Sequence, residues 1–145
     1  MNSILNEIIA TIENEDLAKL ANALIKSIPE YFYHVPASST GRYHPEYSLG
    51  DGGLQRHTVA LVRIMNHMFE ADDRWTSRER DMLRIAGMMH DTRKSGSQED
   101  YENNKYTKFE HPVLAAEVVR MFKGYSWNDD EIELILHAPG LVFDF

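Results

Sequence analysis

Hydrophobic residues recur at helical spacing along most of the chain, and no stretch shows the sustained alternation that is typical of a β-strand. Near the N-terminus, for example, isoleucine returns every four positions, at Ile4, Ile8 and Ile12. Residues three or four positions apart share one face of an α-helix, so this spacing predicts helices with one apolar face. The predicted helices, about six in number, cover residues 3–13, 15–28, 53–70, 76–91, 111–123 and 130–137.

Two long segments interrupt the helical pattern. Residues 30–53 are rich in proline and glycine, and a loop of this length in a compact domain is often functional. Residues 92–108 are polar and are also predicted to form a loop. Between these segments, Thr76 and Glu79 have the spacing of a capping box, which predicts the start of a helix. The sequence therefore predicts one all-α domain, residues 1–145, with a long early loop.

The composition narrows the range of functions. The chain has 145 residues, which suits a single domain with a hydrophobic core. Its net charge of −8, with histidine neutral, disfavours a broad surface that tracks nucleic-acid phosphates, although a small basic pocket is compatible with it. The absence of cysteine excludes disulfides, a thiolate nucleophile and a cysteine zinc cluster. Because there is no basic signal-peptide region and no membrane-spanning run, we expect a soluble cytoplasmic protein without a membrane partner.

Three of the seven histidines fall on predicted apolar faces. The apolar residues on the face of His57 are Leu54, Leu61, Ile64 and Met68, and those on the face of His111 are Leu114, Ala115, Val118 and Phe122. His90 falls near the apolar residues of its own helix. His67, in contrast, falls among charged residues and is predicted to be exposed.

An inward histidine on its own is most simply a hydrogen-bonded core residue, because buried imidazole nitrogens need partners. Three inward histidines on separate helices, one of them followed by Asp91, instead favour a shared metal site. Asp91 falls with Arg80 and Arg84 on the polar side of its helix, so it can join such a site only if the helix ends about there. His137 lies at a predicted helix end, which leaves its direction open.

The order of these residues and the segments around them resemble the HD-domain metal-dependent phosphohydrolase superfamily. The similar segments are GGLQRHT around His57, GMMHDTRKSG around His90 and Asp91, FEHPVLAAEVV around His111 and IELILHAPG around His137. The upstream segment PASSTGRYHPEYSLGDGG is similar to the loop before the first ligand in a subset of these hydrolases. The resemblance covers about residues 36–140, and it implies an HD-domain helical bundle as the fold.

The resemblance also implies a metal site with one or two divalent ions. The implied ligands are His57, His90 and Asp91 for the first ion, with His111 and His137 for a second. Ligands of this kind accept several metals, so the ion could be Mn, Fe, Ni, Co, Zn or Mg. The family has a last aspartate ligand well beyond the position of His137. Either Asp144 substitutes for it, or water fills its place, or a terminal helix is missing.

Two residues are implied to act in catalysis. Asp91 would bridge two ions or hold the attacking water, and Lys94 would meet the substrate phosphate. A divalent ion lowers the pKa of bound water, so no covalent nucleophile is needed. In the flanking loops, Arg42, His44 and Lys108 could close over the substrate or could be ordinary surface charges.

The predicted function is therefore metal-dependent hydrolysis of a phosphate ester or anhydride in a small nucleotide-like substrate. The acidic balance argues for a compact phosphorylated ligand, so no long nucleic acid is expected as a partner. Two alternatives stay open. One is a degenerate HD domain that binds a nucleotide or mediates assembly without turnover, and the other is a nuclease on short single strands. The oligomeric state does not follow from the sequence.

Overall fold

The computed structural model of the protein describes residues 4–37 and 46–105. This part of the chain contains five α-helices, two short 3-10 turns and no β-strand. The elements are α1 (Asn6–Ala10), α2 (Glu15–Ile25), η1 (Glu30–Tyr33), η2 (Glu46–Ser48), α3 (Gly53–Ala71), α4 (Ser77–Met89) and α5 (Gln98–Asn103). The all-α prediction is thereby confirmed. Among the described residues, no helix is both long enough and apolar enough to cross a membrane.

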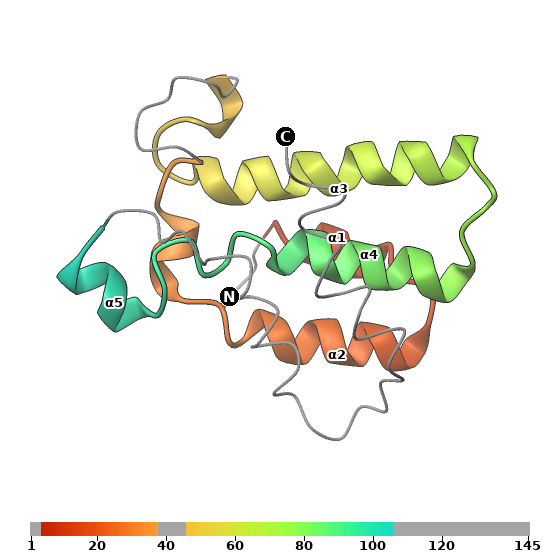
Figure 1. Cartoon of the computed structure of the whole chain (residues 1–145), viewed down its shortest axis with the longest axis horizontal. Coiled ribbons are helices and arrows are strands. Elements are labelled where there is room, and N and C mark those ends of the chain that lie inside the picture. The colour runs from red at the N-terminus through yellow and green to blue at the C-terminus, as the bar shows by residue number, and fades with distance from the viewer. Residues whose placement is uncertain (1–3, 38–45, 106–145) are drawn as a thin grey trace.

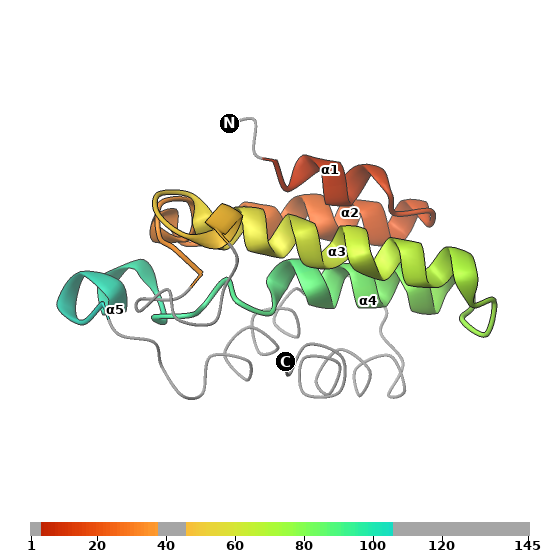
Figure 2. The same cartoon turned by 90° about the horizontal axis from the view of Figure 1, so that it is seen from above.

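The first four helices lie side by side along the long axis of the molecule (Figure 1). α3 and α4 run antiparallel and pack on each other, while α1 packs on α2 and α3 (Figures 1 and 2). α2 covers α4 on the side away from α3, and α5 projects from one end beside η1. The start of α3 and the end of α4 therefore lie at the same end of the bundle.

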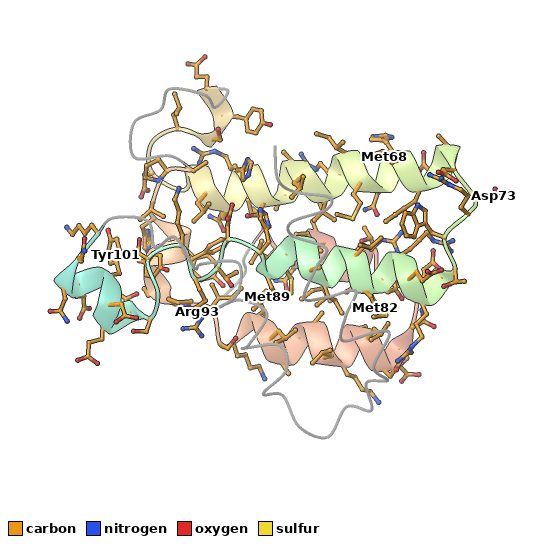
Figure 3. All side chains as sticks on the ribbon, in the orientation of Figure 1. Met68, Asp73, Met82, Met89, Arg93 and Tyr101 are labelled. Atoms are coloured by element: carbon orange, nitrogen blue, oxygen red, sulfur yellow. The ribbon has the colours of Figure 1, made fainter. Side chains whose placement is uncertain are left out.

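The main core lies between the four long-axis helices, and Phe32 of η1 closes it. Full burial of a leucine, isoleucine, valine, methionine or phenylalanine side chain stabilises the folded protein by about 1.5–3 kcal/mol. The largest fully buried side chains are Leu5, Ile8, Leu17, Leu20, Leu24, Phe32, Leu54, Val62, Met82, Ile85, Met88 and Met89. The methionines of α4 are core residues, and Met82 and Met89 mark its length in Figure 3.

The buried face of α3 differs from the predicted one. The sequence places His57 on the core side with Leu54, Leu61, Ile64 and Met68; Leu54 is buried, but Ile64 is 57% and Met68 61% exposed. The residues that α3 buries are Gly53, Leu54, Thr58, Val59, Val62 and Met65. This face lies about a quarter of a turn away on a helix of 3.6 residues per turn. Both stripes have helical spacing, so only packing against α4, η1 and η2 decides between them.

The side of α4 that the sequence marks as polar, where Arg84 falls, is partly buried in the structure. Arg84 is only 6% exposed. Its guanidinium donates to the Asp81 carboxylate at 2.7 Å and to the Asn66 side-chain oxygen at 2.7 Å, and it lies over the Phe69 ring. A buried charge is tolerated when it is paired and hydrogen-bonded, and a helical wheel cannot show such a partner.

Local signals were more reliable at the helix ends. The predicted capping box is present, with the Thr76 side chain accepting from the Glu79 N–H and the Glu79 side chain accepting from the Thr76 N–H. The predicted loop 92–108 contains a short helix, α5, that begins with a similar box between Ser97 and Asp100. The sequence signal for α5 is weak because aspartate stands where a capping box usually has Glu or Gln.

Candidate metal site

Three predicted ligands, His57, His90 and Asp91, meet at the end of the bundle where α3 begins and α4 ends. One ligand atom from each of them lies within 4.8 Å of the other two. Nε2 of His90 is 3.0 Å from Oδ2 of Asp91, and Nε2 of His57 is 3.8 Å from the same oxygen. The two imidazole rings are 6.2 Å apart between centroids. A set of two imidazoles and one carboxylate is suited to a divalent first-row metal.

The place where α4 ends explains how Asp91 reaches this cluster. The helix ends at Met89, and His90 is its C-cap residue. Asp91 therefore lies beyond the last helical turn and is not held on the polar side of the wheel. This was the condition under which the sequence allowed Asp91 to join the histidines.

The start of α3 places His57 through two glycines. Gly52 precedes the helix with a φ of +75°, a conformation that residues with a Cβ rarely adopt. A Cβ on Gly53 would lie 2.2 Å from the carbonyl oxygen of Ser48, so η2 can approach the helix only if residue 53 is glycine. The segment GGLQRHT thus has a physical reason for both glycines, one helical turn before His57.

A backbone contact orients the His90 ring. Its Nδ1–H donates to the carbonyl oxygen of Gly87 at 2.6 Å, which leaves Nε2 facing Asp91. Burial of His90 disfavours its charged form, but the Asp91 carboxylate and the Gly87 carbonyl outweigh this effect. The pKa of the His90 imidazole therefore lies above its usual value.

The cluster is sheltered and still accessible. The side chain of His90 is buried, whereas those of His57 and Asp91 are 25% and 17% exposed. His90 is thus the member of the cluster that the protein encloses most, while His57 and Asp91 keep partial contact with solvent.

Lys94 lies on the turn that follows the cluster. Its backbone N–H donates to the carbonyl oxygen of Asp91 at 3.2 Å, and its ammonium group donates to the carbonyl oxygen of Ala37. Burial lowers the pKa of the Lys94 amine, and the charge of Asp91 opposes this shift only in part. Arg93 points elsewhere, because its guanidinium donates to the Ser27 carbonyl at 2.8 Å at the end of α2.

The other predicted site residues lie outside the described part of the chain. They are Arg42, His44, Lys108, His111, His137 and Asp144. Their roles stay predictions. His67, which the sequence placed in solvent, is exposed on α3 and lies 3.8 Å from the Glu70 carboxylate.

A groove of about 740 Å³ between α1 and α3 includes none of the three clustered residues in its lining. Its two arginines are engaged in the protein. Arg63 makes a bidentate pair with Glu7, and Arg56 donates to three backbone carbonyls between residues 47 and 51. Neither arginine of this groove is therefore free to bind a phosphate without losing these partners.

Comparison with known proteins gives a functional indication. No protein-family model matches the chain, and no solved structure matches it. The chain is 24% identical over 139 residues to the 3'-5' exoribonuclease YhaM of Listeria welshimeri serovar 6b. The match covers 92% of this chain and 42% of that protein, so the chain spans less than half the length of this relative. The similarity suggests a hydrolase of the nuclease or phosphohydrolase type, and membership of the HD superfamily stays a prediction.

The comparison corrects one prediction, namely that no long nucleic acid is expected as a partner. A match to a protein named as an exoribonuclease points toward a nucleic-acid substrate. The prediction rested on the net charge of −8, which describes the whole molecule and not the charge at one binding site. An enzyme that acts at a strand end needs positive charge only where a few phosphates bind.

Proposed function

We propose that this chain carries a metal-dependent phosphodiesterase site that hydrolyses RNA from a strand end. The observation that carries the proposal is the convergence of His57, His90 and Asp91 from two helices, with ligand atoms within 4.8 Å of one another. The similarity to a 3'-5' exoribonuclease supports RNA as the substrate and the 3' end as the point of attack. The absence of cysteine is compatible with hydrolysis that uses no covalent intermediate.

The clustered residues fit a divalent cation. His90 presents Nε2 because its other nitrogen is bonded to Gly87, and Asp91 faces both imidazoles. His111 and His137 are proposed as ligands for a second ion, and the metal is one of Mn, Fe, Ni, Co, Zn or Mg. Bound there, such an ion would supply Lewis-acid activation of water and of the phosphoryl oxygens.

The protein's own groups supply positioning and charge. Asp91 lies next to two imidazoles and can accept a proton from the attacking water. The Lys94 ammonium, now on the Ala37 carbonyl, can turn its donors toward a non-bridging phosphate oxygen and stabilise the charge that develops there. Arg42, His44 and Lys108 are proposed to contact the rest of the substrate.

A small nucleotide is the second candidate substrate. It stays a candidate because the cluster of His57, His90 and Asp91 could act on a phosphate ester of any length. Both candidates use the same site and the same chemistry, so substrate length separates them.

The test combines metal analysis with a substrate series. The purified protein is analysed for bound metals and then assayed with Mn, Mg, Ni and Co on a model phosphodiester, on single-stranded RNA labelled at the 5' end, and on nucleotides. We expect one or two ions per chain and a ladder of RNA products shortened from the 3' end. Cleavage of nucleotides alone would favour the second candidate.

A pair of histidines on α3 provides the matched control. His57→Ala should abolish metal binding and turnover, whereas His67→Ala changes an exposed histidine ten residues later and should leave both unchanged. Ligand binding without turnover by any substrate would indicate the non-catalytic module. Equal behaviour of the two variants would refute the proposed site.

A further inference from the structure

A buried tyrosine of η1 holds the segment that follows the His90–Asp91 pair. The hydroxyl of Tyr31 donates to the carbonyl oxygen of Gly96 at 2.8 Å and accepts from the Ser95 N–H at 2.8 Å. The backbone N–H of Tyr31 donates to the side-chain oxygen of Gln98 at 2.8 Å. The Tyr31 side chain is almost fully buried, so these bonds are shielded from water.

The same segment carries the charged groups of the candidate site. From Asp91 onward the backbone makes two successive turns, closed by Lys94 N–H to Asp91 carbonyl at 3.2 Å and by Gly96 N–H to Arg93 carbonyl at 2.8 Å. The Tyr31 hydroxyl thus holds one end of this run and the end of α4 holds the other. Lys94 lies between these two fixed points, next to Ser95.

We infer that Tyr31 is a positioning residue, whose hydroxyl holds the turn that directs Lys94 toward the substrate phosphate. The inference rests on the proposed function, because it assigns Lys94 a role in that reaction. A displacement of about 1 Å in a catalytic group can lower a rate about 10²-fold. We therefore expect the loss of two buried hydrogen bonds next to Lys94 to lower turnover while the protein stays folded.

Tyr31 itself does not take part in the chemistry. Its hydroxyl is engaged by two backbone groups, and burial raises the pKa of this phenol to about 12. Both partners of the hydroxyl are thus backbone groups of the protein, and the phenol keeps its proton near neutral pH.

The ring of Tyr31 is held separately from its hydroxyl. It stacks on Tyr101 of α5 with a centroid distance of 4.5 Å and an angle of 14° between the planes. Figure 3 labels Tyr101, which lies on α5, and Arg93, which lies on the turn after α4. Tyr31→Phe therefore removes the two hydrogen bonds and keeps the stack, and Tyr101→Phe makes the same chemical change on the partner ring.

The first test is kinetic. We expect Tyr31→Phe to keep bound metal and to lower kcat/KM about 10–100-fold, whereas Tyr101→Phe stays within twofold of the parent. In a Lys94→Ala background, Tyr31→Phe should have less than a twofold further effect, because a residue that acts through Lys94 has nothing left to position. An equal loss in both backgrounds would show a purely structural role and overturn the inference.

The second test does not depend on turnover. Hydrogen exchange at the Ser95 amide should accelerate in Tyr31→Phe, and acylation of Lys94 by an amine reagent should rise several-fold relative to exposed Lys19. Failure of the parent protein to cleave any substrate would refute the proposed function, and these readouts would still report on the turn. An unchanged Lys94 acylation rate would overturn the inference even in an active enzyme.

Discussion

The two ends of α4 each carry an aspartate close to a histidine or an arginine, but the surroundings of the two carboxylates differ. Near the N-terminal end, Asp81 is fully buried and accepts hydrogen bonds from the backbone N–H groups of Glu13 and Asn14, from the Asn14 side chain and from Arg84. These donors come from the α1–α2 connection and from α4 itself, so the carboxylate joins three helices. Its capacity to accept further ligands is used up within the protein.

At the C-terminal end, Asp91 is partly exposed and faces the imidazoles of His57 and His90. An imidazole nitrogen can hold a proton or a metal, whereas a backbone N–H can only donate. A buried aspartate that is paired with an arginine therefore does not by itself indicate a catalytic site. The partners of a carboxylate, more than its burial, separate a structural charge from a reactive one.

The largest expected effect comes from removing the charge at the C-terminal end. Asp91→Asn should lower kcat of the proposed reaction by on the order of 10³-fold, equivalent to about 4 kcal/mol, because the proposed role of the carboxylate is to hold the metal and to activate the attacking water. Circular dichroism and thermal unfolding should show an intact fold, since Asp91 lies outside the helix and outside the core. A folded Asp91→Asn protein with parental kcat would refute the distinction between the two ends.

The next effect concerns the N-terminal end. Asp81→Ala should lower the free energy of unfolding by about 3 kcal/mol, because buried Arg84 loses its nearest carboxylate and the N–H groups of Glu13 and Asn14 lose their acceptor. Urea titration measures this loss, and Asp73→Ala, which changes an exposed acid near the start of α4, should stay within about 0.5 kcal/mol. The fraction of Asp81→Ala that remains folded should keep the kcat of the parent. A reduced kcat in that fraction would show that the N-terminal end of α4 affects the candidate site at its C-terminal end.

Sequence reasoning succeeded where the signal is local. The capping box at Thr76 and the four predicted helices before residue 92 depend on residues a few positions apart. The meeting of His90 and Asp91 with His57 was also predictable, because three ligands of two types in sequence order carry information beyond periodicity.

Sequence reasoning was wrong or silent where distant contacts decide. The face of α3 that is buried depends on which helices pack against it, and two stripes were equally compatible with the pattern. The burial of Arg84 depends on Asp81 and on Asn66, which lies on another helix. The Ser95 N–H donates to the Tyr31 hydroxyl, which lies 64 positions earlier in the chain. No local sequence pattern predicts a hydrogen bond between segments so far apart.

A smaller effect concerns the ionisation of Tyr31, whose hydroxyl holds the turn after the C-terminal end of α4. The pKa of Tyr31 is about 12 in the folded protein, against a reference value of 10.0. A raised folded-state pKa means that the neutral phenol stabilises the fold below about pH 10, and that this contribution is lost as the pH rises toward 12. Unfolding free energies measured from pH 9 to 12 should therefore fall more steeply for the parent than for Tyr31→Phe. Parallel curves would show that the phenol is not buried as described.

The smallest expected effect is at the helix caps. Thr76→Ala removes the cap of α4 and should lower the free energy of unfolding by about 1 kcal/mol, which is about 2–4 °C in Tm for a chain of this size. Ser97→Ala removes the corresponding cap of α5, a helix with no buried residue, and should change Tm less. Because Thr76 lies a whole helix away from His90, its loss should leave metal affinity and kcat unchanged. If Thr76→Ala weakened metal binding, α4 would transmit changes between its ends, and the separation of a structural end from a reactive end would fail.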